Sequence, residues 1–177
     1  MTHQPASGPR YRLDVAAAFH RGLRAGGVTF AVYLPDSLLD PIERLVDDDP
    51  AVQTVVCTRE DEGIAMAMGA YLGGKLGVAL MEGSGLGLSG LILARGMLQR
   101  TPLLLIASHD RALGVQFDYH GATRMVAQAT LEGLGIPCVT LYAAEIVETA
   151  VREALLTVKG QRIPVGLLVP RHLMIES

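Results

Sequence analysis

The sequence predicts an α/β protein with a doubly wound, six-stranded parallel sheet flanked by helices. Its 177 residues are 50% hydrophobic and only 19% charged, which is enough apolar material for one sizeable core. The 20 glycines and 9 prolines are spread along the chain, as expected for alternating strands and helices joined by short turns. Residues 11–177 are therefore expected to form a single domain, and residues 1–10 a polar, flexible N-terminal segment.

Six short runs rich in aliphatic residues are expected to form the strands. In chain order they cover residues 28–34, 52–58, 76–81, 102–108, 137–142 and 163–169. Each run is continuously apolar, which is typical of strands buried on both faces of a parallel sheet. The segments before and between them have helical periodicity. The expected helices cover residues 13–25, 37–46, 60–72, 87–98, 122–134 and 144–159. Regular alternation of strand and helix predicts the doubly wound arrangement.

Charge and patterning exclude several classes of protein. Lys and Arg number 15 against 18 Asp and Glu, and no basic run occurs, so nucleic acid is a poor candidate ligand. The polar start lacks the hydrophobic core of a signal peptide and no run resembles a membrane span, which predicts a cytoplasmic location. Cys57 and Cys138 lie in apolar runs and are expected to be buried free thiols. We assign no metal ligand to this chain.

Candidate functional residues lie in the loops that follow the strands, because ligands of open parallel sheets bind beyond the carboxyl ends of the strands. The loops after the first four strands contain residues 35–37, 58–63, 82–87 and 109–123. The third loop carries Gly83, Gly85 and Gly87, which could expose backbone N–H groups to an anion. It lacks the other marks of a phosphate-binding loop. A tight turn that lets strand and helix approach closely is the favoured interpretation.

Three consecutive acidic residues open the helix expected at residues 60–72. Glu60 and Asp61 suit the positive end of a helix, which is a structural role. Glu62 differs because the helix continues as IAMAMGAYLGG, with no polar side, and a helix that is apolar all round is typically buried. We therefore expect the Glu62 carboxyl group to lie in apolar packing, with a raised pKa unless it finds a partner. The small residues of this helix also favour packing against another subunit.

Three motifs carry a resemblance to a known family. GVTFAVYLPDSLL, REDEGIAMAMGAYLGGK and LMEGSGLGLSG, in this order and spacing, resemble the pyrimidine-binding (PYR) domain of thiamine diphosphate enzymes. The resemblance is greatest to the separate alpha subunit of sulfopyruvate and phosphonopyruvate decarboxylase-type enzymes. It implies that Glu62 hydrogen-bonds N1′ of the aminopyrimidine and so promotes removal of the thiazolium C2 proton. Under the same resemblance, the expected cofactor contacts also include Pro35, Asp36, Ser84 and Gly85.

The resemblance also implies a partner. Enzymes of this kind hold the diphosphate through Mg²⁺ on a second domain marked by Gly-Asp-Gly and a later Asn, and these 177 residues contain no Gly-Asp-Gly. The expected assembly is a hetero-oligomer with a beta subunit that holds Mg²⁺ and the diphosphate. The cofactor would then span the interface between the two subunits.

Departures from the family pattern bear on the substrate. Related decarboxylases have Met-Gln-Asn-Ser-Gly-Leu-Gly-Asn where this chain has residues 81–88, so Glu82 and Leu88 replace amide side chains. An acid repels a sulfonate or phosphonate, whereas Leu88 offers apolar contact. The expected substrate is a less charged 2-oxo acid or an aldehyde, bound by Asp36, Glu82, Leu88 and Arg111. The reaction would be decarboxylation or acyloin-type carbon–carbon bond making or breaking.

Two histidines are candidates for proton transfer. His120 matches a His in the family's substrate loop, and His109 is the second candidate; for each, a solvated loop residue is the alternative. The predicted function is thus the alpha subunit of a thiamine diphosphate-dependent 2-oxo acid decarboxylase or C–C lyase, active only with its beta subunit. The alternative is a non-catalytic, flavodoxin-like binding or regulatory module that kept the fold and lost the chemistry.

Overall fold

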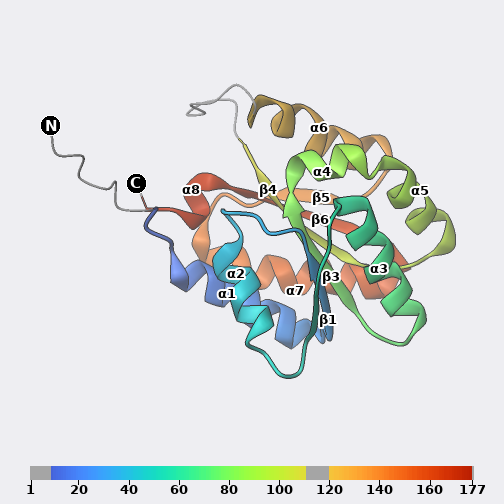
Figure 1. Cartoon of the computed structure of the whole chain (residues 1–177), viewed down its shortest axis with the longest axis horizontal. Coiled ribbons are helices and arrows are strands. Elements are labelled where there is room, and N and C mark those ends of the chain that lie inside the picture. The colour runs from blue at the N-terminus through green and yellow to red at the C-terminus, as the bar shows by residue number, and fades with distance from the viewer. Residues whose placement is uncertain (1–8, 111–119, 177) are drawn as a thin grey trace, which may run out of the picture.

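A computed structural model, which describes residues 9–110 and 120–176, has one six-stranded parallel sheet between two layers of helices (Figure 1). The strand order is β2-β1-β3-β4-β6-β5. The strands are β1 Phe30–Tyr33, β2 Gln53–Val56, β3 Gly77–Glu82, β4 Leu104–His109, β5 Cys138–Thr140 and β6 Val165–Pro170. Each lies within its predicted run or extends one residue beyond it, so the predicted fold class and all six strands are confirmed.

The helices connect the strands as predicted, with differences at their ends. They are α1 Leu13–Gly26, α2 Asp40–Asp47, α3 Glu60–Leu72, α4 Gly83–Leu88, α5 Gly90–Gln99, α6 His120–Gly133, α7 Val147–Thr157 and α8 Arg171–Met174. A 3-10 turn at Ala144–Ile146 precedes α7, and a π turn at Val158–Arg162 follows it. The short α8 was not predicted. The prediction that a helix starts at Ser37 is wrong, because the Asp36 carboxylate accepts the N–H groups of Leu38 and Leu39 and holds a turn there.

The glycine-rich segment differs most from the prediction. Instead of a loop followed by one helix, it forms α4 from Gly83 onward, and Ser89 separates α4 from α5. The predicted close approach is confirmed: a Cβ at Gly83 would lie 2.5 Å from the Ser108 carbonyl oxygen on β4. A Cβ at Gly87 would lie 2.8 Å from Cβ of Val126 on α6. Tertiary packing at these glycines therefore offsets their poor intrinsic helix propensity.

The core has two halves, one on each face of the sheet. Leu104 and Ile106 of β4 point to one side, where they pack with α1, α2 and α7. Leu105 and Ala107 point to the other, where they pack with α3, α4, α5 and α6. Figure 1 shows these two helical layers on either side of the strands. The predicted burial of the strands on both faces is thus confirmed for β1, β3, β4 and β6, whereas the edge strands β2 and β5 are partly exposed.

The topology creates one natural place for a ligand. The chain moves from β1 to β2 in one direction and then crosses to place β3 on the other side of β1. At such a switch point the connections after neighbouring strands diverge, which opens a crevice at their carboxyl ends. The loop after β1 and the last residue of β3 border this crevice.

Two further expectations concern cysteines and membranes. Both cysteines are free; Cys57 is buried as expected, whereas Cys138 is only half-buried because it lies on the edge strand β5. Across the part of the chain that the structure describes, none of the helices is long and apolar enough to cross a membrane.

Candidate functional site

A cleft of about 430 Å³ occupies the switch point, at the carboxyl ends of β1, β3, β4 and β6. Four of its eight polar side chains are acidic. We call it the acidic cleft, lined by Leu34, Pro35, Asp36, Ser37, Leu38, Glu60, Glu82, Ser108, His109, Asp110 and Arg171. The structure thus brings together four residues that the sequence predicted for the site: Pro35, Asp36, Glu82 and His109.

Asp36 is the most firmly held carboxylate of the cleft. Its Oδ1 accepts the N–H groups of Leu38 at 2.7 Å and Leu39 at 3.0 Å, and its Oδ2 accepts the hydroxyl of Ser108 at 2.8 Å. Burial raises the pKa of Asp36, with a smaller contribution from the charge of Glu82, while the three hydrogen bonds act in the opposite direction. These bonds fix Asp36 between the β1 loop and β4.

Glu82 reaches the same cleft from the end of β3. Its Oε1 accepts the hydroxyl of Thr123, a fully buried residue of α6, at 2.8 Å. In the sheet register Glu82 lies beside Ser108, the residue that donates to Asp36. One network therefore joins the loop after β1, the ends of β3 and β4, and the start of α6.

His109 ends β4 and contributes an imidazole to the cleft. The residue is 8% exposed, and its Nδ1 makes no hydrogen bond to any residue that the structure describes. Burial lowers the pKa of His109; the nearby Asp110 opposes this effect and Arg124 adds to it. The lowered pKa favours the neutral ring, which has one N–H donor and one lone pair.

Glu43, which lies behind the cleft on α2, was not predicted from the sequence. Its Oε1 accepts the backbone N–H of Asp36 at 3.1 Å. Glu43 is 5% exposed, and burial raises its pKa to about 8, with further contributions from Asp36, Asp40 and Asp47. A signal was available: Glu43 continues the spacing of the buried Leu39, Ile42 and Val46, so it falls on the apolar stripe of the helix.

Other lining residues were also missed, among them Glu60, Ser108 and Arg171. Glu60 lies in the first turn of α3, Ser108 near the end of β4, and Arg171 directly after β6. Glu60 was assigned a structural role, and it does fill the space beside Gly85, where a Cβ would collide with its side chain. Ser108 and Arg171 occupy strand ends, which is the signal that could have identified them.

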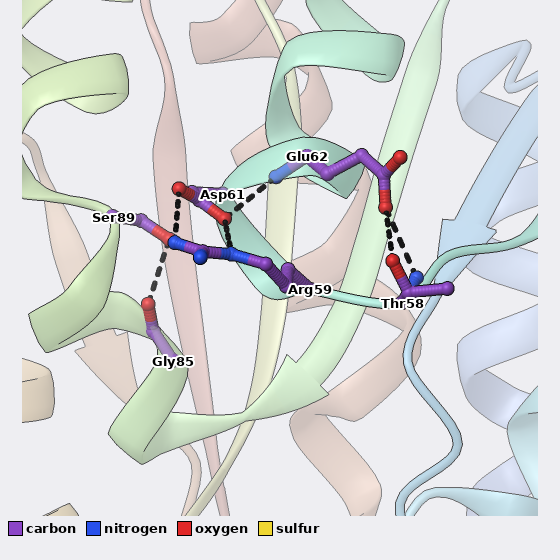
Figure 2. Close-up of polar contacts among 6 residues, drawn as sticks. All are labelled: Thr58, Arg59, Asp61, Glu62, Gly85 and Ser89. Carbon is purple, nitrogen blue, oxygen red and sulfur yellow. Dashed lines mark hydrogen bonds and ion pairs between the residues drawn. The ribbon is translucent and has the colours of Figure 1, made fainter.

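Glu62 lies outside the acidic cleft, and the prediction that its carboxyl group lies in apolar packing is wrong. The side chain is exposed, and its Oε2 accepts both the backbone N–H of Thr58 at 3.1 Å and the Thr58 hydroxyl at 2.9 Å. These two bonds lower the pKa of Glu62. In Figure 2 the carboxylate turns toward Thr58, away from the ion pair between Arg59 and Asp61.

The physical reason lies in the two faces of α3. The helix buries Gly63, Ile64, Ala67 and Met68 against the sheet. Glu62 lies on the opposite face, with Ala65, Gly69 and Leu72, all of which are exposed, Leu72 at 77%. We call these four residues the Glu62 face. The helices of the same layer expose further large apolar side chains: Leu88, Leu91, Leu98 and Met125. Exposed apolar surface of this extent is typical of interaction sites.

The other predicted site residues are dispersed. Ser84 and Gly85 belong to α4 and do not line the cleft; Gly85 is buried against Glu60. Leu88 is 54% exposed at the end of α4, so it provides no apolar wall for the cleft. Arg111 lies outside the described residues. His120 begins α6, but its side chain is not described.

The chain is similar in sequence to known proteins. A family model described as "Thiamine pyrophosphate enzyme, N-terminal TPP binding domain" matches residues 13–141. The chain resembles the sulfopyruvate decarboxylase subunit alpha of Methanothermobacter thermautotrophicus, with 39% identity over 99 residues, 55% of this chain and 60% of that protein. Phosphonopyruvate decarboxylase of Streptomyces viridochromogenes is 44% identical over 72 residues, 41% of this chain and 18% of that protein.

A solved structure supports the fold. The 2-oxoglutarate:ferredoxin oxidoreductase of Magnetococcus marinus matches with a TM-score of 0.72 and 18% identity, over 97% of this chain and 31% of that one. The matched segment spans 60% of the Methanothermobacter thermautotrophicus alpha subunit named above. Since the family model covers residues 13–141, from the start of α1 to just beyond β5, this chain belongs to the family of thiamine pyrophosphate enzyme N-terminal TPP-binding domains.

Proposed function

We propose that this chain is the alpha subunit of a hetero-oligomeric thiamine diphosphate-dependent enzyme that cleaves or forms a carbon–carbon bond next to a carbonyl, most simply a 2-oxo acid decarboxylase. Family membership supports the cofactor, and the relatives named "subunit alpha" support a partner. The observation that carries the proposal is the position of Glu62, a charged carboxylate on an exposed apolar helix face.

The chemistry of Glu62 fits an aminopyrimidine. Both hydrogen bonds from Thr58 end on Oε2, so Oε1 has no hydrogen bond to the described residues. A carboxyl oxygen without a hydrogen bond is able to bind a ring nitrogen of the aminopyrimidine. Glu62 can give that nitrogen a proton only if the pKa of its carboxyl group is high enough. Covering Ala65, Gly69 and Leu72 with a partner would remove water from Glu62 and raise its pKa. The burial expected from the sequence would then arise on assembly.

Thiamine diphosphate, when bound, supplies a nucleophilic carbon that adds to the substrate carbonyl and then accepts the electron pair of the broken bond. In this proposal Glu62 would hold the aminopyrimidine and exchange a proton with it. Pro35, Asp36, Ser84 and Gly85 remain predicted cofactor contacts. The beta subunit would hold Mg²⁺ and the diphosphate.

The acidic cleft is the proposed place for the substrate. Asp36 and Glu82 are fixed by hydrogen bonds, so they can orient a ligand without rearrangement. His109 presents a neutral imidazole, which can take up or release a proton near neutral pH once a ligand changes its surroundings. His109 is therefore the candidate proton relay that the geometry supports best, and His120 and Arg111 remain predicted site residues.

The substrate is proposed to carry no second anionic group. Asp36, Glu60, Glu82 and Asp110 all line the cleft, and carboxylates repel a sulfonate or phosphonate. The relatives are named for sulfopyruvate and phosphonopyruvate, so this chain would differ from them in the group that it accepts. A 2-oxo acid with an uncharged side chain, or an aldehyde, fits the cleft better.

The test compares the chain alone with the chain and its proposed beta subunit, which is to be sought in the neighbouring open reading frame by its Gly-Asp-Gly motif and later Asn. Calorimetry should detect Mg²⁺-dependent binding of thiamine diphosphate by the mixture and only weak binding, if any, by this chain. The mixture should decarboxylate a panel of 2-oxo acids, with sulfopyruvate among the poorer substrates. Tight Mg²⁺-dependent binding by the chain alone would overturn the shared site, and a mixture that turns over no 2-oxo acid or aldehyde would favour the non-catalytic alternative.

A further inference from the structure

The hydrogen-bonding groups of the acidic cleft are only partly paired within the chain. Both oxygens of Asp36 already accept bonds, and the Ser108 hydroxyl is used by Asp36. Glu82 uses Oε1 for Thr123, whereas its Oε2 makes no bond to the described residues. His109 is more than nine-tenths buried, with Nδ1 unpaired among those residues. Buried polar atoms usually have hydrogen-bond partners, so Nδ1 of His109 is a candidate to hydrogen-bond a ligand atom.

We propose that the acidic cleft recognises a hydroxyl group of the substrate through Glu82 and His109, so that the preferred substrate is a hydroxylated 2-oxo acid or hydroxyaldehyde. That the hydroxylated ligand is a substrate rests on the proposed function. Its binding to the acidic cleft needs only this chain. A hydroxyl has one hydrogen to donate and lone pairs to accept. It can donate its hydrogen to Glu82 Oε2 and accept the N–H of the neutral His109 ring.

Other ligand groups match less well. A sulfonate or phosphonate would face four carboxylates, and Arg171, the cationic side chain among the described lining residues, is exposed. An ammonium offers only donors and would leave the His109 N–H without an acceptor. An alkyl group would leave both Glu82 Oε2 and the imidazole unpaired in a desolvated place, which carries a free-energy penalty.

The test uses a pair of ligands that differ only at this group. Hydroxypyruvate and 2-oxobutanoate have the same chain length and carboxylate, with a hydroxyl in one where the other has a methyl. Each is titrated into the isotopically labelled chain, and amide and His109 ring signals are followed by nuclear magnetic resonance. Hydroxypyruvate should move the signals of His109 and Ser108 saturably and bind roughly tenfold tighter than 2-oxobutanoate. A site that hydrogen-bonds a hydroxyl rejects the analogue that lacks it.

Substitutions of His109 and Glu82 test whether these residues cause the preference for hydroxypyruvate over 2-oxobutanoate. His109→Phe keeps an aromatic ring without nitrogen and should reduce the affinity ratio of the two ligands to about one, as judged from amide signals. Glu82→Met is the second variant, in case His109→Phe does not fold. Glu153→Gln, an exposed substitution on α7 outside the acidic cleft, should leave the ratio unchanged.

Two results would overturn the inference. One is equal affinity of the unmodified chain for hydroxypyruvate and 2-oxobutanoate, or no saturable shift with hydroxypyruvate. The other is an unchanged affinity ratio in both folded variants. Because this titration contains neither thiamine diphosphate nor a beta subunit, its failure would leave the cofactor-binding test of the proposed function untouched. Conversely, a chain that discriminates the ligands without supporting turnover would retain the hydroxyl site and lose the proposed reaction.

Discussion

Glu62 and the acidic cleft both present carboxylates at the carboxyl-end side of the sheet, yet their surroundings are opposite. Asp36 and Glu43 are desolvated by the chain itself, and their pKa values are raised. Glu62 is exposed and stabilised as an anion by Thr58, and its pKa is lowered. The chain thus desolvates Asp36 and Glu43 on its own, whereas the environment that the proposed proton transfer at Glu62 requires would have to come from another surface.

The two places should also differ in whether a substitution affects stability or the proposed catalysis. The cleft groups are part of the packed structure, so changing them alters the free energy of unfolding as well as ligand binding. Glu62 contributes little to folding because its side chain is solvated, and its proposed role begins only on assembly. Substitutions at the two places should therefore affect different observables.

The largest expected effect is that of Glu62→Gln on the assembled enzyme. The amide fills the same volume but cannot exchange a proton, so turnover and C2 hydrogen–deuterium exchange of bound cofactor should fall roughly 10²- to 10⁴-fold. The free energy of unfolding of the chain should change little, because the Glu62 side chain is exposed. Asp61→Asn, on the same helical turn, is the matched control and should retain exchange. Unchanged exchange in Glu62→Gln would remove Glu62 from the mechanism.

The second effect is on the pH dependence of stability, through Glu43. Its pKa is about 8 in the folded chain and near the ordinary 4.5 when unfolded, so the folded state binds the proton more tightly. Stability from this group is full below pH 4.5 and is lost as the pH rises toward 8. Glu43→Gln should remove this loss, on the order of a few kcal/mol at pH 8. Urea unfolding at pH 5 and pH 8 measures this loss of stability. The exposed Glu145→Gln is the control. Parallel dependence of stability on pH in Glu43→Gln and the unmodified chain would contradict a pKa of Glu43 raised by burial.

Glycine substitutions probe how closely α4 approaches the cleft. Gly83→Ala would place a Cβ 2.5 Å from the Ser108 carbonyl oxygen, so it should destabilise the chain by about 1–3 kcal/mol. Gly90→Ala, in α5, meets no atom within 4 Å and should stabilise the chain by up to about 1 kcal/mol, because alanine favours a helix. Thermal unfolding compares the two. Equal effects would mean that close packing does not determine the path of this segment.

The smallest expected effect concerns Thr58. Thr58→Val removes the hydroxyl that donates to Glu62 but keeps the backbone N–H, which is the larger cause of the lowered pKa. The pKa of Glu62 in the isolated chain should therefore rise only part of the way to its ordinary value. Thr58→Ser retains a hydroxyl and should leave it unchanged. A Glu62 pKa that is identical in Thr58→Val and the unmodified chain would show that the hydrogen bond from the Thr58 hydroxyl does not lower the pKa of Glu62.

The strands were predictable because β1, β3, β4 and β6 are buried on both faces, and such burial requires a continuous apolar run in the sequence. Asp36, Glu82 and His109 could be placed at one site for a related reason, since strand ends meet at one edge of a parallel sheet. The helical conformation of Gly83–Leu88 was not predictable locally, because contacts with β4 and α6 determine it.

The burial of Glu62 failed as a prediction for a specific physical reason. The residues of α3 are apolar on every side, so the sequence contains no periodicity to indicate which face meets the sheet. Glu62, Ala65, Gly69 and Leu72 share a face by spacing alone, and whether that face meets the core or a second protein depends on the rest of the fold. Glu43 is the opposite case, because a clear apolar stripe marks its position.

The central claim is that assembly, and not the isolated chain, gives Glu62 the environment of an acid–base group. Its side-chain carboxyl carbon can be labelled with ¹³C and titrated by nuclear magnetic resonance, first in the isolated chain and then in the complex with the beta subunit. The account predicts a pKa of Glu62 below its ordinary value in the isolated chain and above it in the complex. The same lowered pKa in both states would contradict the account, because Glu62 would then remain a solvated anion in the assembled enzyme.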